Sequence, residues 1–284
     1  MTTEINAGFI PLLDAAIPII AVERGFCEEE GIRLRLHKET SWANIRDRLT
    51  ISHFDAAHLL APMPIAAALI KDPMYPDLVV PMALGLGGNA VTVSTVLWDA
   101  MLAHGARETG DASINGQALR RVCEARRAAR QSPLKLGVVH RFSSHNLELR
   151  YWLAASGIDP EADIEFVIVP PPFMADALRA RKLDGYCVGE PWNAHAVDLG
   201  AGVIATTKSS IWRCSPEKVL AVRAAWADEN PDALDGLIRA MAKASVWCAH
   251  ANNAEALADI LARDAYLGCR PDLLVRGLTG TMPF

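Results

Sequence analysis

Strand-like and helix-like segments alternate along most of the chain, and this alternation constrains the fold more than any other feature. Short apolar runs typical of strands occupy residues 5–10, 32–36, 54–59 and 78–84. A second series begins at Leu134 and continues to Val188. Strands that are connected by helices lie mostly parallel to one another in a shared sheet. The sequence therefore predicts an α/β protein with a largely parallel sheet.

Two such series within 284 residues predict two lobes rather than one minimal core. We place the passages between the lobes near residues 87–94 and 189–196. The first lobe is then discontinuous, and the expected division is lobe I at 1–92, lobe II at 93–192 and lobe I again at 193–284. Ligands of such folds bind in the cleft, near the carboxyl ends of strands.

The charge of the chain excludes a general nucleic-acid binder. The formal net charge is -5, and Glu124 interrupts the arginine-rich stretch from Arg120 to Arg130. That stretch is interpreted as the solvated face of a helix, so no direct contact with nucleic acid is expected.

The N-terminus and the cysteines bear on the compartment. The N-terminus has no basic segment followed by an apolar core, and the apolar run from Ala15 to Val22 is shorter than the ~20 residues of a membrane span. The six cysteines occur singly, which is typical of reduced thiols. We predict no membrane insertion and a cytoplasmic location, with the periplasm as the alternative if a signal peptide was removed.

Two motifs are better explained without a cofactor or a metal ion. Gly85-x-Gly87-x-x-Ala90 matches a dinucleotide fingerprint, but a strand-like run follows it where a helix is required, so a turn or hinge is expected. The histidine pairs His53/His58 and His140/His145 are spaced by five residues, and no further ligands complete a metal site. The sequence predicts neither a metal nor a cofactor.

Two other positions favour an anion. Ser143 and Ser144 precede a helix directly after a strand, and helix N-termini attract anions, although ordinary capping beside a packed His145 explains the pattern equally well. Trp42 follows a predicted strand in a loop, where its indole N–H can line a cleft.

Several longer strings, in collinear order, cover nearly the whole chain. They are Gly8 to Ala16, Ser41-Trp42 with Arg46-Asp47, Ala57 to Pro64, Arg150 to Pro160, Val169 to Pro172, Cys187 to Asn193, and Pro216-Glu217-Lys218. Together they resemble the nitrate- and bicarbonate-binding proteins of ABC transporters and the cytoplasmic relatives that sense nitrate or nitrite. The resemblance implies the type II periplasmic-binding-protein fold. It also implies a longer C-terminal part than the one ending at Phe284, so truncation is one interpretation.

The resemblance implies a ligand pocket formed by five residues. Position by position, they are Trp42, Asn89, His145, Gly189 and Lys218. Asn89 stands where nitrate binders usually have glutamine, and it keeps an amide donor on a shorter arm. A flat, weakly basic anion needs several N–H donors and a cation, without a carboxylate aimed at it.

Three functions follow as hypotheses. The first is a cytoplasmic nitrate or nitrite sensor that controls nitrate assimilation through an RNA-binding antiterminator partner. The second is the substrate-binding component of a nitrate ABC transporter, with a membrane permease as partner. The third is an enzyme on the same scaffold using Cys187 or His145. A mid-strand thiol is usually inert, so no catalytic residue is expected.

Overall fold

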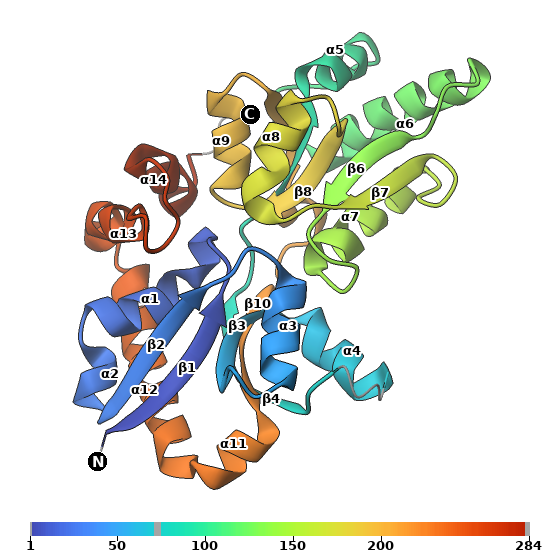
Figure 1. Ribbon diagram of the computed structural model, residues 1–284. Helices are drawn as coiled ribbons and strands as arrows, with labels where there is room; N and C mark the ends of the chain where they lie inside the picture. The colour runs from blue at the N-terminus through green and yellow to red at the C-terminus, as the bar shows by residue number, and fades with distance from the viewer. Residues whose placement is uncertain (1, 71–74, 282–284) are drawn as a thin grey trace. The chain divides into compact units, whose positions relative to one another are not determined.

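The chain forms two compact units in the computed structural model, which describes residues 2–70 and 75–281 (Figure 1). Unit 1 is built from two segments, up to Leu86 and from Pro216 to Gly280, and unit 2 is built from Gly87–Ser215. The first unit is therefore discontinuous. Residues 193–215 belong to unit 2 and not to the first lobe as expected, because the strand at Gly202–Thr207 pairs with a strand of that unit.

A five-stranded mixed sheet forms the centre of unit 1. Its order is β2 (Ile32–Lys38), β1 (Thr3–Phe9), β3 (Ala56–Leu60), β10 (Lys218–Arg223) and β4 (Leu78–Gly85). Strand β1 runs parallel to both β2 and β3, whereas β10 runs antiparallel to β3 and β4. The first strand of the returning segment thus lies inside the sheet made by the first segment.

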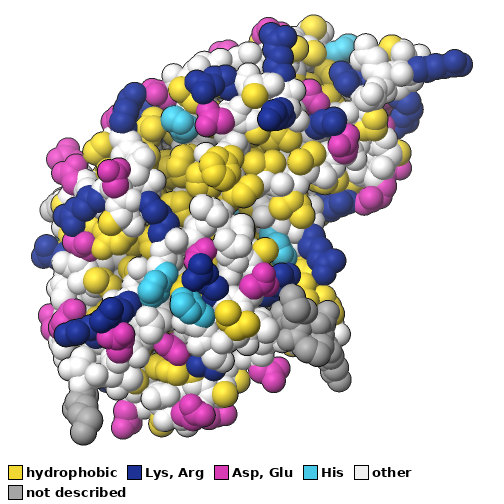
Figure 2. Space-filling model, viewed as in Figure 1, with side chains coloured by type: hydrophobic (Ala, Val, Ile, Leu, Met, Phe, Trp, Pro, Cys, Tyr) yellow, Lys and Arg dark blue, Asp and Glu magenta, His cyan; other side chains and the backbone are white. Residues whose placement is uncertain are grey.

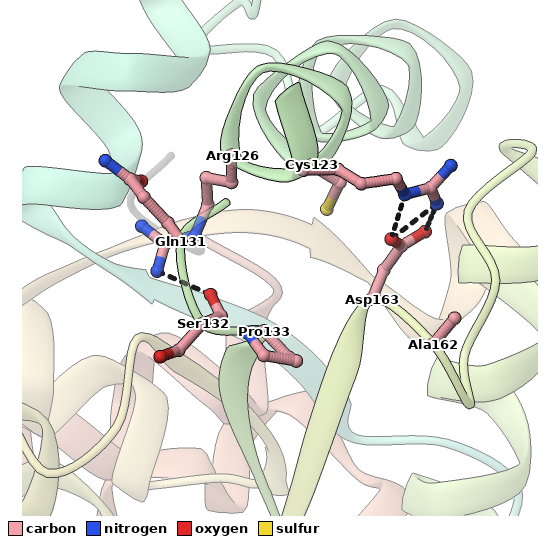
Figure 3. A pocket seen from close by; sticks show the side chains of 8 residues that line it. Cys123, Arg126, Gln131, Ser132, Pro133, Ala162 and Asp163 are labelled. Carbon is pink, nitrogen blue, oxygen red and sulfur yellow. Dashed lines mark hydrogen bonds and ion pairs between the residues drawn. The ribbon is translucent and has the colours of Figure 1, made fainter. Parts of the chain in front are cut away.

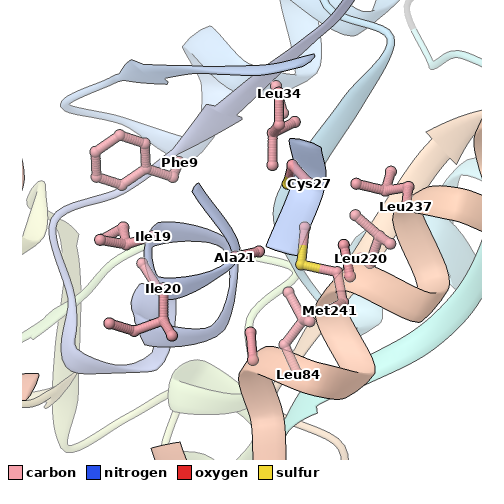
Figure 4. Close-up of a cluster of buried hydrophobic side chains, with 14 of the residues drawn as sticks. Phe9, Ile19, Ile20, Ala21, Cys27, Leu34, Leu84, Leu220, Leu237 and Met241 are labelled. Carbon is pink, nitrogen blue, oxygen red and sulfur yellow. The ribbon is translucent and has the colours of Figure 1, made fainter. Parts of the chain in front are cut away.

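Helices cover the sheet of unit 1 and bury its core. They are η1 (Leu13–Ala15), α1 (Ala16–Glu23), α2 (Phe26–Glu29), α3 (Trp42–Thr50), α4 (Pro62–Ile70), α11 (Ala224–Glu229), α12 (Pro231–Ala249), η3 (Ala251–Asn253), α13 (Ala254–Leu261) and α14 (Pro271–Thr279). Figure 4 shows Ile19 and Ile20 of α1 and Leu237 and Met241 of α12 within one apolar cluster. Burial of each such side chain stabilises the fold by about 1.5–3 kcal/mol.

Unit 2 repeats the arrangement with its own five-stranded sheet. The order is β7 (Ile164–Ile168), β6 (Leu134–Val138), β8 (Gly185–Gly189), β5 (Asn89–Ser94) and β9 (Gly202–Thr207). Strand β6 is parallel to β7 and β8, whereas β5 is antiparallel to β8 and β9.

The helices of unit 2 pack around this sheet. They are α5 (Thr95–Ala103), α6 (Ala112–Ala128), α7 (Ser144–Ala155), η2 (Pro171–Phe173), α8 (Met174–Arg179), α9 (Trp192–Asp198) and α10 (Lys208–Ile211). Helix α6 contains the arginine-rich stretch. It buries Leu119 and Val122, while Arg120 forms an exposed i, i+4 ion pair of 2.8 Å with Glu124. Basic and acidic side chains are interspersed on the face in Figure 2.

The α/β architecture confirms the predicted fold class, but the prediction of a largely parallel sheet is wrong. The antiparallel strands β5 and β10 each begin a segment that has just left the other unit. A parallel neighbour needs a helical crossover within the same sheet, and these two strands are not entered through one. Strand β5 follows Gly88 directly, so no helix follows the glycines, as the sequence predicted. Within residues 2–70 and 75–281, no helix has both the length and the apolar character needed to cross a bilayer.

Candidate anion-binding site

Lys218 opens strand β10 and holds together a buried charged cluster in unit 1. The side chain is fully buried, with its Nζ 2.7 Å from Asp14 Oδ2 and 2.9 Å from Glu217 Oε1. Asp14 comes from η1, and Glu217 immediately precedes the strand. Two close carboxylates offset the hydration that a buried ammonium loses. The cation expected for the anion is therefore already paired with two carboxylates.

Trp42 and His58 complete this group, which we name the unit 1 cluster: Asp14, Trp42, His58, Glu217 and Lys218. Lys218 Nζ lies 5.6 Å from the centroid of the Trp42 ring, and the His58 and Trp42 ring centroids are 5.4 Å apart. Among the described residues, no acceptor bonds to the buried Nε1 of Trp42. The structure thus brings two predicted ligand residues, Trp42 and Lys218, together and leaves an indole N–H available to a ligand.

Trp42 lies at the first position of helix α3 and not in a loop as predicted. Ser41, in an extended conformation, caps this helix by accepting a hydrogen bond of 3.2 Å from the backbone N–H of Asn44. The cap lets the helix begin one residue after the serine, and Trp42 is fully buried there. Asp14, in the short helix η1, makes no capping bond and instead contacts Lys218 and His58.

The charges of the unit 1 cluster stabilise one another. Burial by itself raises the pKa of Asp14, but the charge of Lys218 and the close contacts with Lys218 and His58 outweigh it and hold this pKa well below its usual range. Burial lowers the pKa of Lys218, and Asp14 and Glu217 reverse this, so the pKa ends above its ordinary value. Asp14 is therefore a carboxylate and Lys218 an ammonium at neutral pH.

In unit 2, the N-terminus of helix α7 presents the donors that the sequence predicted. Ser143 caps it, accepting a 3.1 Å hydrogen bond from the N–H of Asn146 and donating one of 2.7 Å to the carbonyl of His140. His145 is fully buried in the first turn. The Oγ of Ser144 is buried and has no partner among the described residues. The amides and dipole of a helix start favour an anion.

Gly189 ends strand β8 beside Asn89, its register partner on β5. The N–H of Glu190 donates to the carbonyl of Gly88 at 3.1 Å. In an antiparallel pair, bonded and non-bonded positions alternate, so the Gly189 amide points away from β5. It faces the neighbouring strand β6, whose carboxyl end leads to α7. The N–H of Gly189 therefore points to the side of β8 on which β6 lies, and β6 leads into helix α7 with His145.

Asn89 is held by a carboxylate that the sequence analysis missed. Its Nδ2 donates to Glu148 Oε2 at 3.3 Å, and Glu148 lies one turn after His145 on α7. Lys208 Nζ and Ser215 Oγ lie 4.0 Å and 3.2 Å from Glu148 Oε1. Because a carboxylate only accepts, the amide nitrogen must face Glu148.

The buried Oδ1 of Asn89 has no hydrogen-bond partner in the described part of the chain. Glu148 thus engages one of the two N–H groups of Asn89, and its second N–H and its Oδ1 acceptor remain. We name Asn89, His145, Glu148, Gly189 and Lys208 the unit 2 cluster.

Glu190 is a second carboxyl group next to a predicted ligand residue. It is buried, its Oε2 accepts a hydrogen bond of 3.2 Å from the N–H of Ala194, and its Oε1 has no partner among the described residues. Burial raises its pKa to about 7, against the opposing effect of hydrogen bonds from Ala194 and Asn193. The backbone donor of Gly189 is therefore followed by a carboxyl group that changes charge near neutral pH.

A small cavity elsewhere in unit 2 includes none of the predicted residues (Figure 3). It measures about 60 Å³ and lies against Cys123, Arg126 and the fork between Arg127 and Asp163. Burial raises the pKa of the Cys123 thiol to about 12, which makes it a poor nucleophile. Cys187, the candidate of the enzyme hypothesis, is buried within the core strand β8.

The family model described as NMT1-like matches residues 1–262. The chain belongs to the NMT1-like family. Among curated relatives of this NMT1-like chain, the "Nitrate/nitrite binding protein NrtA" of Nostoc sp. is 33% identical over 289 residues, covering 100% of this chain and 62% of the relative. The "Bicarbonate transport ATP-binding protein CmpC" of Synechococcus elongatus is 33% identical over 271 residues, 94% of this chain and 38% of the relative.

A solved structure supports the assignment of the chain to this family. The crystal structure of the periplasmic nitrate-binding protein NrtA from Synechocystis PCC 6803 superimposes with a TM-score of 0.86 and 30% identity, over 97% of this chain and 69% of that one. The resemblance to nitrate-binding proteins and the periplasmic-binding-protein-like fold are thereby confirmed. The NMT1-like chain spans about three fifths of the NrtA length that it matches.

Five contributing side chains escaped the sequence analysis: Asp14, His58, Glu148, Lys208 and Glu217. Asp14, His58 and Glu217 stood inside strings that carry the family resemblance, which was the signal available. Glu148 had the further signal of helical spacing, three residues after His145.

Proposed function

We propose that this chain is the substrate-binding component of an ABC-type importer for nitrate or nitrite. The observation that carries the proposal is the identity of 33% to a named nitrate/nitrite-binding protein over the whole of this chain. The proposal places the transport role ahead of the sensor role, which reverses the order of the hypotheses from sequence. The relatives reported above carry the names of transport components, and an antiterminator partner finds no counterpart in those names.

The two clusters supply the chemistry for such a ligand. Trp42 offers a buried indole N–H, Gly189 a directed amide, and the start of helix α7 offers further amides beside His145. Lys218 contributes the positive charge that a monovalent oxyanion requires. Small oxyanions are held by several convergent donors of this kind. We infer that the five predicted residues contact the ligand.

The partners and the location follow from the same proposal. A binding component delivers its ligand to a permease that an ATP-binding protein drives, and the reported CmpC relative is named as an ATP-binding protein. The NrtA crystal structure is described as periplasmic, so the proposal favours that compartment over the cytoplasm. Binding and release, without catalysis, then account for the activity.

Calorimetric titration with nitrate, nitrite and bicarbonate, with chloride as control, tests the proposal. We expect saturable heat with nitrate or nitrite and weaker or no heat with chloride. If bicarbonate bound as tightly as nitrate and nitrite or more tightly, bicarbonate would replace them as the proposed ligand. No heat with any of the oxyanions at millimolar concentration would overturn it.

A further inference from the structure

The unit 1 cluster carries more negative than positive charge in the absence of a proton on His58. Asp14 and Glu217 contribute two carboxylates, and Lys218 contributes one ammonium. All three side chains are at least nine-tenths buried, so water screens their charges weakly. An anion that enters this cluster adds a further negative charge to a group that already has an excess.

His58 lies where a positive charge on its ring would offset this excess of negative charge. Its side chain is fully buried on β3, and its Nε2 lies 2.9 Å from Asp14 Oδ1. The other oxygen of Asp14, Oδ2, faces Lys218 at 2.7 Å. Asp14 thus lies between two nitrogen groups, one that is always charged and one that can become charged.

The contact of His58 with Asp14 is close but not aligned as a hydrogen bond. Neither ring nitrogen of His58 has a hydrogen-bond partner among the described residues, although the distance to Asp14 is that of an ion pair. Asp14 from η1 and Trp42 from α3 lie against the ring, and Lys218, paired with the preceding Glu217, contacts the other oxygen of Asp14. A proton added to the ring therefore lies beside the Asp14 carboxylate, which needs no rearrangement to pair with it.

We propose that His58 is a further anion-binding residue, which takes up one proton from solvent as the anion binds and becomes an imidazolium paired with Asp14. The inference rests on the proposed function, since it concerns the same ligand. The proton comes from the buffer and ends on a ring nitrogen of His58, and no other bond changes.

The proposal makes binding depend on pH in one direction. Above the pH at which His58 loses its proton in the free protein, each bound anion carries about one proton with it, and affinity falls by up to about tenfold per pH unit. Below that pH, affinity no longer changes because the proton is already bound. A His58→Gln variant lacks both the proton uptake and this pH dependence.

Calorimetry in several buffers of different ionisation enthalpy at pH 8 counts the protons. We expect nitrate binding to the wild-type chain to take up close to one proton, and binding to His58→Gln to be weaker and to take up none. His250→Gln replaces an exposed histidine of the same unit and is the matched control, expected to behave as wild type. Circular dichroism establishes that both variants are folded.

Binding by the wild type without proton uptake would overturn the role of His58 while leaving the proposed function intact. Uptake that persists in His58→Gln would also overturn it and would assign the proton to another group, such as Glu217. Absence of any binding would refute the proposed function itself. If His58→Gln does not fold, the proton number of the wild type, measured from pH 5 to 8, decides instead: it must rise from near zero towards one.

Discussion

The unit 1 cluster and the unit 2 cluster hold their polar groups by different means. The unit 1 cluster relies on full charges, with the ammonium of Lys218 between two carboxylates at 2.7 and 2.9 Å. The unit 2 cluster relies on the Gly189 amide and the start of helix α7, and its ion pair of Glu148 with Lys208 is longer, at 4.0 Å. Full charges fix protonation states and make a site sensitive to pH, whereas backbone donors fix direction and are not titrated. Charged side chains thus predominate in the unit 1 cluster, and directed backbone donors predominate in the unit 2 cluster.

The largest effect is expected from Lys218→Met, which removes the ammonium of the unit 1 cluster. Asp14 and Glu217 then lose the ammonium that lies between them, and we expect a loss of about 3–5 kcal/mol in the free energy of unfolding, with loss of anion binding. Urea denaturation measures the stability. Lys135→Met, which removes an exposed lysine 3.3 Å from Glu165, is the control and should change stability by less than about 1 kcal/mol.

The pH dependence of Lys218→Met checks the cause. In the wild type the pKa of Asp14 is depressed, so its stabilising contribution is present above the ordinary value of 3.8 and is lost as the pH falls towards the folded value. Without the lysine, burial favours the protonated carboxyl groups. Lowering the pH from 7 to 5 should then restore part of the stability of the variant, and a further loss of stability over that range would contradict this explanation.

Glu190→Gln tests a carboxyl group for which burial is the leading influence. The folded pKa is raised to about 7 from an ordinary 4.5, so the folded state binds more protons between these values, and stability falls as the pH rises from 4.5 to 7. The neutral glutamine should therefore raise the free energy of unfolding by up to about 3 kcal/mol at pH 8 and change little at pH 4.5. Glu165→Gln, at an exposed carboxylate, should show no such difference between the two pH values.

Trp42→Phe sharpens the comparison because it removes one side-chain donor and keeps an aromatic ring. A hydrogen bond to a charged group contributes about 1.5–3 kcal/mol, so nitrate affinity should fall by about tenfold or more. Trp226→Phe makes the same change at a buried tryptophan of unit 1 that lies in the apolar core. If both variants bind nitrate with wild-type affinity in calorimetry, the indole N–H of Trp42 does not contact the anion.

The smallest effect is expected from Ser143→Ala, which removes the cap of helix α7. Loss of a capping serine reduces the free energy of unfolding by about 1 kcal/mol, and anion affinity should fall modestly because the helix start is less well held. Ser94→Ala removes the equivalent cap of α5, where Ser94 accepts from the N–H of Leu97 at 3.1 Å. Both should show similar losses of stability in urea, but only Ser143→Ala should weaken binding.

Local patterns predicted most of the secondary structure. Strand β2 at Ile32–Lys38 includes the predicted run 32–36, and Ser143 caps α7 in the manner its position implied. Failures occurred where the partner of a residue lies far away in sequence. Asp14 was not predicted to contribute, because its partner Lys218 is 204 positions later and shares no local pattern with it.

The sequence by itself determined the two α/β series, the family resemblance and the identity of the groups able to donate to an anion, because these depend on short-range periodicity and on residue type. Only the tertiary structure decided the antiparallel places of β5 and β10, the transfer of residues 193–215 to unit 2, and the carboxylates that face Asn89 and Lys218. Strand pairing and charge pairing join segments that are distant along the chain. Their energies depend on burial and distance, which local patterns do not contain.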